Sequence, residues 1–438
     1  MPLHLMTHAS MLLGSRAALP LLRTGSLPWN PALAKAAESL RAGLAGAGPD
    51  EWTEFDKAIE AEGVARHQAV LDGIELYRRH PYRRALPPPA VLWRQGTTSV
   101  LDFRAGPEPG SGGLPVLVIP SLINRSYILD LTARRSLLRY LAAHGFAPFL
   151  VDWDAPGAEE TGFDLTDYIA GRLCAALDAV VAATGGTVAL VGYCMGGDLA
   201  LALAQLRPDA VSALALLATP WDFHASREAH GALMRALAGP LGRVIAQVGN
   251  VPVDMLQSMF AALDPTLNGR KFAAFARLPQ RRAKARDFVA LEDWANDGVA
   301  LAGPVAHECL FGWYGDNTPA RGGWRVAGRV VSPAAIRCPT LAIIPERDRI
   351  VPPDSALPLA AAIPGCRLVT VKGGHVGMLL SSRAKTEVYG PLAKWLVRSA
   401  LHNTGCATPR PRTKRLAVIS SSDGRNDRGK DSKRRTLP

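Results

Sequence analysis

The stretch VALVGYCMGGDLALALAQL at residues 188–206 decides the fold of this chain. An apolar run with strand character leads into Cys194, an alanine-rich helical run follows it, and Gly192 and Gly196 flank it. This Gly-x-Cys-x-Gly spacing is typical of a nucleophile elbow, a sharp strand-to-helix turn that holds the reactive side chain in a strained conformation. Glycine is expected at the flanking positions because a Cβ there would meet neighbouring backbone. The pattern predicts that Cys194 is a nucleophile.

A thiol at the elbow indicates which type of acyl donor and acceptor to expect. When a thiol attacks a thioester, the product is another thioester of nearly equal energy, so the acyl group stays activated for transfer to an alcohol. The residue type therefore favours acyl transfer from a thioester donor. The alternative is that Cys194 is a buried structural thiol, a common fate of cysteine, and its place in the elbow argues against that alternative.

Apolar, strand-like runs alternate with helical segments on both sides of the elbow. The expected strands are 116–120, 146–153, 188–193, 213–218, 341–345 and 367–371, and the helical segments between them include 136–144, 166–184 and 198–206. This alternation predicts an α/β fold with a mostly parallel sheet and helices on both faces. Residues 221–331 interrupt the alternation with helix-like and loop-like sequence that contains several Trp, Phe and Arg, and we expect them to form an inserted helical cap over the carboxyl edge of the sheet.

Three segments are expected along the chain. Residues 1–113 form an N-terminal helical extension, in which the periodic stretch 51–79 ends before three consecutive prolines. Residues 114–400 form the catalytic domain with its cap at about 221–331, and residues 401–438 form a basic tail that we expect to be disordered. Ten Lys and Arg against three Asp lie between Arg410 and Pro438, so most of the net charge of +12 is in the tail. A solvated extension is the simpler interpretation, and binding to nucleic acid or an anionic surface is the alternative; we expect no specific nucleic-acid partner.

Composition and cysteine usage limit the class of protein. The chain has 438 residues with 48% hydrophobic content, enough to bury a large core. Its six cysteines form no CxxC pair and show no metal-ligand spacing, which argues against a disulfide framework or a zinc site. No apolar stretch reaches the roughly 20 residues needed for a transmembrane segment. We expect a soluble, cytoplasmic protein without a bound metal or cofactor. The first 37 residues lack Asp and Glu, as transit peptides do, and a poorly ordered start is an equal alternative.

An acid and a base are expected after the elbow, in that chain order and each on a loop that follows a strand. LAIIPERDRIVPP places Asp348 after one apolar run, and RLVTVKGGHVGML places His375 after the next. Glu346 and Asp354 lie nearby and are alternative candidates for the acid, and Asp348 is otherwise an ordinary loop carboxylate. The alternative for His375 is that it is a surface histidine. We predict that His375 generates the thiolate of Cys194 and that Asp348 orients the imidazole.

An oxyanion hole is also expected near the nucleophile. One donor is the backbone N–H of Met195, at the start of the elbow helix. The second is an N–H from the loop after the first core strand, for which Ile123 is the candidate.

Four separated stretches together resemble the polyhydroxyalkanoate synthases. They are VIPSLINRSYILDLT at 118–132, FLVDWDAPG at 149–157, VGYCMGG at 191–197, and ERDRIVPP with KGGHVGM at 346–353 and 372–378. This combination is far more specific than an elbow alone. The resemblance implies an α/β-hydrolase fold that moves the acyl group of a 3-hydroxyacyl-CoA onto cysteine and then to the hydroxyl of a growing polyester, with CoA released and no further cofactor. It assigns Cys194 as the acylated nucleophile, His375 as the general base and Asp348 as the triad carboxylate, which in the family is also discussed as activating the substrate hydroxyl.

The resemblance has departures and further implications. Ser126 stands where such sequences often have proline or an aromatic residue, and Asp154 stands where they often have glycine or another neutral residue. The short N-terminal extension is similar to that of synthases with a second subunit, which implies an accessory synthase subunit as a partner, and a homodimer and a location at the polyester granule surface are further expectations. Two aromatic and acidic segments, LEDWANDG at 291–298 and FGWYGDN at 311–317, either line an acyl or polymer channel or pack onto the core.

Two other functions remain open on the sequence. A cysteine-dependent thioesterase or polyester depolymerase uses the same fold and triad with water as the acceptor. A non-catalytic granule-surface or scaffold protein is the third hypothesis, and the intact set of Cys, Asp and His argues against it.

Overall fold

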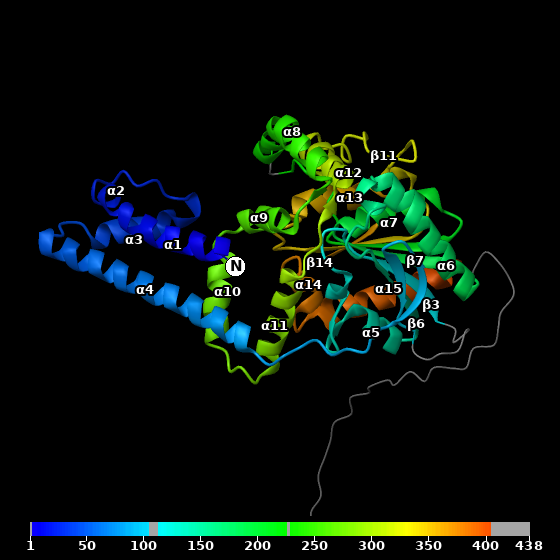
Figure 1. Cartoon of the computed structure of the whole chain (residues 1–438), viewed down its shortest axis with the longest axis horizontal. Coiled ribbons are helices and arrows are strands. Elements are labelled where there is room, and N and C mark those ends of the chain that lie inside the picture. The colour runs from blue at the N-terminus through cyan, green and yellow to red at the C-terminus, as the bar shows by residue number, and fades with distance from the viewer. Residues whose placement is uncertain (1, 105–112, 226–227, 404–438) are drawn as a thin grey trace, which may run out of the picture.

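The computed structural model describes residues 2–104, 113–225 and 228–403. An eight-stranded sheet lies among the helices of its larger part (Figure 1). Its strands lie in the order β1 (Ala90–Gln95), β2 (Thr98–Asp102), β6 (Phe146–Asp152), β3 (Leu114–Ile119), β7 (Val188–Tyr193), β8 (Val211–Leu217), β13 (Thr340–Pro345) and β14 (Arg367–Val371). The strands from β6 to β14 pair in parallel, whereas β1 with β2 and β2 with β6 pair antiparallel. The predicted mostly parallel sheet is confirmed, and all six expected strands are present.

Strands β1 and β2 extend the sheet beyond the six that the sequence predicts. They lie within the segment 1–113 that the sequence groups as an extension, so the sheet begins before residue 114. β1 is an edge strand whose residues are exposed or half-buried, and it therefore lacks the continuous apolar run that marks the inner strands.

Two hydrophobic cores cover the two faces of the sheet. Alternate side chains of β3 point to opposite faces: Leu117 and Ile119 belong to one core, Val116 and Val118 to the other. The first core contains residues of η4 (Asp167–Leu173), α6 (Cys174–Thr184), α7 (Met195–Leu206) and α13 (Pro353–Ala362). The second contains residues of α5 (Leu137–Ala143), α14 (Gly377–Leu380), η7 (Lys385–Tyr389) and α15 (Gly390–Asn403). Helices on both faces are therefore confirmed.

The insertion between β8 and β13 is mainly helical, as predicted for the cap. It contains α8 (Glu228–Val248), β9 (Asn250–Val251), α9 (Val253–Leu263), α10 (Leu267–Ala276), α11 (Ala283–Asn296), β10 (Leu301–Ala302), α12 (Gly303–His307), η5 (Glu308–Gly315), β11 (Arg325–Val326), β12 (Arg329–Val330) and η6 (Pro333–Ala335). Short elements also connect the strands of the main sheet: η2 (Ser126–Leu129), β4 (Asp130–Thr132), β5 (Arg135–Ser136) and η3 (Glu160–Gly162).

An N-terminal arm projects from the rest of the molecule (Figure 1). It consists of α1 (Pro2–Ala17), α2 (Leu19–Arg23), η1 (Pro31–Leu33), α3 (Ala34–Gly43) and α4 (Pro49–Arg79). The C-terminal part of α4 packs against cap helix α10, where Val70, Ile74 and Phe272 form a small apolar cluster. Tyr77 on α4 also donates a hydrogen bond to Asp293 on α11 at 2.8 Å. The arm is therefore attached to the cap.

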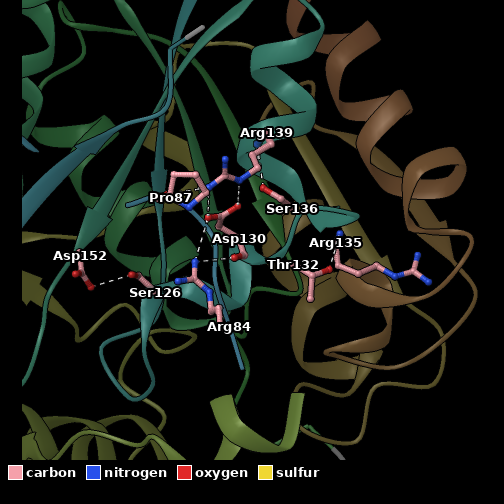
Figure 2. A network of polar contacts seen from close by, with 9 residues as sticks. All are labelled: Arg84, Pro87, Ser126, Asp130, Thr132, Arg135, Ser136, Arg139 and Asp152. Atoms are coloured by element: carbon pink, nitrogen blue, oxygen red, sulfur yellow. Dashed lines mark hydrogen bonds and ion pairs between the residues drawn. The ribbon is translucent and has the colours of Figure 1, made fainter. Parts of the chain in front are cut away.

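A buried carboxylate fixes the connection from the arm to the sheet (Figure 2). Asp130, only 1% exposed, accepts hydrogen bonds from Arg84 in the connection and from Arg139 on α5. Arg139 also donates to the carbonyl oxygen of Pro87 at 3.3 Å. Two arginines thus compensate one buried charge and hold the connecting segment against α5 and the sheet. The expected basic tail lies, from residue 404 onward, outside the described residues.

Among the described residues, the structure contains no helix that combines the length and the apolar character of a transmembrane span.

Candidate active site

The elbow at Cys194 has the strained geometry that the sequence predicts. Cys194 joins β7 to α7 with φ +56° and ψ −133°, a conformation that L-residues rarely adopt. A Cβ on Gly192 would lie 2.4 Å from the Cα of Gly197, and one on Gly196 would lie 2.1 Å from the carbonyl oxygen of Ile119. Side chains are therefore excluded at both flanking glycines, and the turn presents the thiol at the carboxyl edge of the sheet.

Asp348 and His375 meet at the same edge, on the loops that follow β13 and β14. The Nδ1 atom of His375 lies 2.7 Å from Oδ2 of Asp348, and the two residues are 8% and 4% exposed. The other oxygen of Asp348 accepts hydrogen bonds from the backbone N–H groups of Ile350 and Val351, both at 2.9 Å. These bonds fix the carboxylate so that it orients the imidazole. The competing carboxylates Glu346 and Asp354 are both exposed.

The imidazole of His375 interacts with the thiol of Cys194 on its other side. Burial lowers the pKa of His375, but the charge of Cys194 together with the hydrogen bonds to Asp348 and Cys194 outweighs burial and raises this pKa to about 10. A protonated imidazole beside a cysteine is the arrangement that can stabilise a thiolate, the reactive form of a cysteine nucleophile. The structure thus brings together all three residues that the sequence predicted for the triad.

Tyr193 is a supporting residue that the sequence did not single out. Its buried hydroxyl donates to the backbone carbonyl of His375 at 3.2 Å, and the two rings lie 5.1 Å apart. This contact links the strand before Cys194 to the loop that contains His375. Its position next to Cys194 was the available signal, but a tyrosine beside a nucleophile does not by itself indicate which backbone group it reaches.

The two predicted oxyanion-hole residues differ in their surroundings. Met195 is the first residue of α7, so its N–H has no partner within the helix and lies at the positive end of the helix dipole. The N–H of Ile123 donates to Oγ of Ser121 at 3.2 Å, within its own loop. Ile123 and Cys194 both line the active-site cavity. The role of these two N–H groups in holding an oxyanion remains a prediction.

A cavity of about 610 Å³ lies over Cys194 and His375. Its wall includes apolar residues of α9 and α10 in the cap, among them Phe260, Leu263 and Phe272. Its charged residues, apart from His375, are five basic and two acidic: Arg125, Arg270, Lys271, Arg347, Arg349, Asp264 and Glu292. The cavity therefore offers an apolar lining together with an excess of positive charge.

The two aromatic cap segments have different positions. In the segment 291–298, Trp294 lines the cavity and donates through Nε1 to the carbonyl oxygen of Arg125 at 2.8 Å. In the segment 311–317, Trp313 is buried against Phe223 and Trp324. The first segment thus contributes to the cavity wall, and the second packs into the core.

A buried carboxyl group lies in the first turn of the helix that follows Cys194. Asp198, in the first turn of α7, is 1% exposed, and neither of its carboxyl oxygens has a hydrogen-bond partner within the described part of the chain. Burial, followed by the charge of Cys194, raises the pKa of Asp198 well above its usual value. A neutral carboxyl group at this place does not oppose the negative charge on the thiol. The sequence shows only an acid within an apolar helix, and its isolation follows from tertiary packing.

The two departures from the synthase pattern have local structural roles. Oγ of the buried Ser126 donates to Oδ1 of Asp152 at 2.8 Å (Figure 2). Asp154 adopts φ +56°, in the left-handed region that favours glycine, and its carboxylate pairs with Arg125. Neither residue contacts the triad through a described hydrogen bond.

Comparison with known proteins gives consistent matches. Residues 115–381 match the family model described as alpha/beta hydrolase fold. The chain is 31% identical over 292 residues to the poly(3-hydroxyalkanoate) polymerase subunit PhaC of Allochromatium vinosum, covering 66% of this chain and 82% of that protein. It is 29% identical to the corresponding subunit of Haloferax mediterranei, covering 76% and 68%. Among solved structures, an esterase from Thermogutta terrifontis matches with a TM-score of 0.43 at 19% identity, covering 69% of this chain and 93% of that one.

Proposed function

The chain belongs to the poly(3-hydroxyalkanoate) polymerases, a family of the α/β-hydrolase fold, and we propose that it transfers the acyl group of a 3-hydroxyacyl-CoA through a cysteine thioester to the hydroxyl end of a polyester. The proposed class of reaction rests on the similarity to the polymerase subunits. The observation that carries the assignment of the site is the arrangement of Cys194, His375 and Asp348 beneath a cavity of substrate size.

The first half-reaction charges the enzyme. The sulfur of Cys194 attacks the thioester carbonyl of the substrate, with its proton held by His375, and a carbon–sulfur bond forms to the enzyme. The bond to the CoA sulfur then breaks, and the imidazolium returns its proton to the departing CoA thiolate. The N–H of Met195, and that of Ile123 after release from Ser121, would hold the negative oxygen formed between these steps.

The second half-reaction extends the polymer. The hydroxyl at the end of the polyester gives its proton to His375 as its oxygen attacks the Cys194 thioester, and the new ester bond forms as the carbon–sulfur bond breaks. Asp348 keeps the imidazole oriented and stabilises its protonated form throughout. The steps balance with the two substrates and these side chains, so we propose that the enzyme uses no further cofactor.

Exclusion of water determines whether the product is polymer or free acid. A thioesterase or depolymerase would deliver the same acyl group to water, and the similarity to polymerases favours the alcohol as the acceptor. The apolar cap residues Phe260, Leu263 and Phe272 in the cavity wall support this choice, because they suit an aliphatic polyester chain and disfavour bulk water.

Exposed apolar side chains support a location at the polyester granule. On α8, Leu233, Leu237, Val244 and Val248 are between 37% and 53% exposed, and their spacing places them along one side of the helix. We propose that the enzyme works in the cytoplasm with such a surface against its apolar product. We also propose an accessory subunit or a second copy of the chain as a partner of the projecting N-terminal arm, where Met6, Leu13, Leu33 and Val64 are exposed.

A product assay tests the proposed function. The purified protein is given 3-hydroxybutyryl-CoA, CoA release is followed, and insoluble polyester is separated from free 3-hydroxybutyrate, with Cys194→Ala as the control. Polyester with CoA release from the native chain alone is the expected result. Free acid as the main product would assign a thioesterase instead. No CoA release from the native chain, even with a partner polymerase subunit added, would contradict the proposal.

A further inference from the structure

A three-residue clasp lies at the cavity, between the cap and the loop of the catalytic acid. We define the clasp as Asp264, at the end of α9, with Arg270 on α10 and Arg349, the residue after Asp348. Nη2 of Arg270 lies 2.8 Å from Oδ2 of Asp264, and Arg349 donates to the same oxygen. All three residues line the cavity that contains Cys194. One carboxylate oxygen thus joins two guanidinium groups from different parts of the fold.

The two arginine side chains are much more exposed than the side chain of Asp264, so another anion can reach them and take the place of Asp264. The arginine side chains are 58% and 70% exposed, whereas that of Asp264 is 11% exposed. Burial raises the pKa of Asp264, but hydrogen bonds from Thr266 and Arg270 with the charges of Arg270 and Arg349 lower it overall, so the carboxylate is ionised. Ion pairs of exposed arginines are screened by solvent and contribute little to stability. A stronger anion can therefore replace Asp264.

Two other basic side chains of the cavity, Lys271 and Arg125, are less exposed than these arginines. Lys271, 26% exposed, contacts Glu292 at 2.8 Å, and that carboxylate is only 5% exposed. Arg125, 27% exposed, pairs with Asp154 and Asp297. Arg270 and Arg349 are more exposed than Lys271 and Arg125, and their guanidinium forks match the oxygens of a phosphate. Arg347, the remaining basic residue of the lining, is also exposed.

The substrate of the proposed reaction brings several negative phosphate oxygens to this cavity. A CoA thioester has its acyl carbonyl at one end of a long pantetheine arm and its phosphates at the other. With the carbonyl at Cys194, the arm must leave through the cavity, where the basic lining residues outnumber the acidic ones. Resting on the proposed function, we propose that Arg270 and Arg349 hold the phosphate groups of the CoA thioester, and that Asp264 occupies both arginines until this substrate displaces it.

The exchange has a structural consequence for the cap. In the free enzyme, Asp264 ties the corner between α9 and α10 to the residue next to Asp348. When phosphate takes both arginines, this carboxylate no longer holds the corner to the catalytic loop. Substrate binding thereby loosens the cap at the place where the polyester chain must also enter or leave.

Paired substrates test the proposal. Turnover is measured with 3-hydroxybutyryl-CoA and with 3-hydroxybutyryl-pantetheine, which keeps the thioester and lacks the nucleotide phosphates. For the double variant Arg270→Gln/Arg349→Gln we expect KM for the CoA ester to rise about tenfold or more, and the rise for the pantetheine ester to be several-fold smaller. Asp264→Asn keeps the shape and removes the competing charge, so it should lower KM for the CoA ester. Arg329→Gln, exposed on β12 and outside the cavity lining, is the control and should match the native enzyme.

The possible results distinguish a failure of the clasp proposal from a failure of the proposed function. Equal rises of KM for both thioesters, or a higher KM for the CoA ester in Asp264→Asn, would overturn the phosphate site. The proposed polymerase function would still stand in that case, provided that the native enzyme forms polyester. Titration calorimetry with free CoA tests the site without turnover. Tighter CoA binding to Asp264→Asn and weaker binding to the double variant, both diminished by added salt, are expected; identical affinities in all three proteins would overturn the inference.

Discussion

Replacing Gly73 by alanine tests whether the N-terminal arm supports the catalytic cap. Gly73 on α4 approaches α10 so closely that an added Cβ would lie 2.1 Å from the carbonyl oxygen of Phe272 and 2.6 Å from its carbonyl carbon. Ordinary contacts of a Cβ begin at 3.4 Å, so the helices must separate by roughly 1 Å, because backbone atoms cannot rotate away. Overpacking of this kind costs about 1–3 kcal/mol, and the higher helix propensity of alanine offsets roughly 0.5–1 kcal/mol of it.

Guanidinium denaturation and steady-state kinetics together measure the effect of Gly73→Ala. We expect a net loss of up to about 2.5 kcal/mol in the free energy of unfolding, and a raised KM for 3-hydroxybutyryl-CoA because Phe272 also lines the cavity. Gly14→Ala in α1 is the matched control: its Cβ would meet nothing within 4 Å, so it should stabilise the protein by about 0.5–1 kcal/mol. If Gly73→Ala stabilised the protein as Gly14→Ala does, α4 would not pack on α10 as described.

Three further perturbations address the triad and its surroundings. Asp348→Asn removes the carboxylate that orients His375 and should lower kcat about 100-fold or more with the fold intact by circular dichroism; unchanged turnover would remove Asp348 from the mechanism. Asp198→Asn replaces the acid by a neutral group of the same shape. Because the pKa of Asp198 is raised on folding, the native protein loses stability as pH rises above about 4, so the free energy of unfolding of the variant should increase relative to that of the native protein as pH rises above this value; a difference that stays the same at every pH would contradict this. The pKa of His375, raised from 6.5 to about 10, gives a contribution to stability that is complete below pH 6.5 and lost as pH approaches 10. Because Cys194→Ala removes one cause of that shift, an NMR titration of the His375 imidazole should give a lower pKa in this variant, and an unchanged pKa would show that the thiol does not raise it.

Much of the fold could be predicted because the inner parallel strands are buried on both faces. Runs such as Val188–Tyr193 are continuously apolar for that reason, and their alternation with helical segments is visible in the sequence. Strand β1 was not predicted, because an edge strand is partly exposed and its residues include Arg94 and Gln95. The arm was predicted only as helical sequence, and its attachment through Gly73 depends on a contact across about 200 positions of the chain.

The candidate triad could be predicted because topology restricts its members. The nucleophile is at a strand-to-helix turn, and the acid and base follow later parallel strands whose carboxyl ends meet at one edge. Asp264 and Arg349 were not predicted as partners, since an acid in a cap and an arginine beside Asp348 carry no signal of their pairing. The isolation of Asp198 likewise arises from the side chains packed around it, which spacing along the helix does not reveal.

Identification of the acylated residue tests the central claim most directly. The native protein is mixed with 3-hydroxybutyryl-CoA, quenched in acid, digested, and its peptides are analysed by mass spectrometry, with Cys194→Ala and Cys366→Ala as variants. We predict a 3-hydroxybutyryl thioester on Cys194 in the native protein and in Cys366→Ala, discharged on addition of a hydroxyl-terminated oligoester, and no acyl group in Cys194→Ala. Polyester formed by Cys194→Ala, or an acyl group on another residue that discharges into polyester, would contradict the assignment.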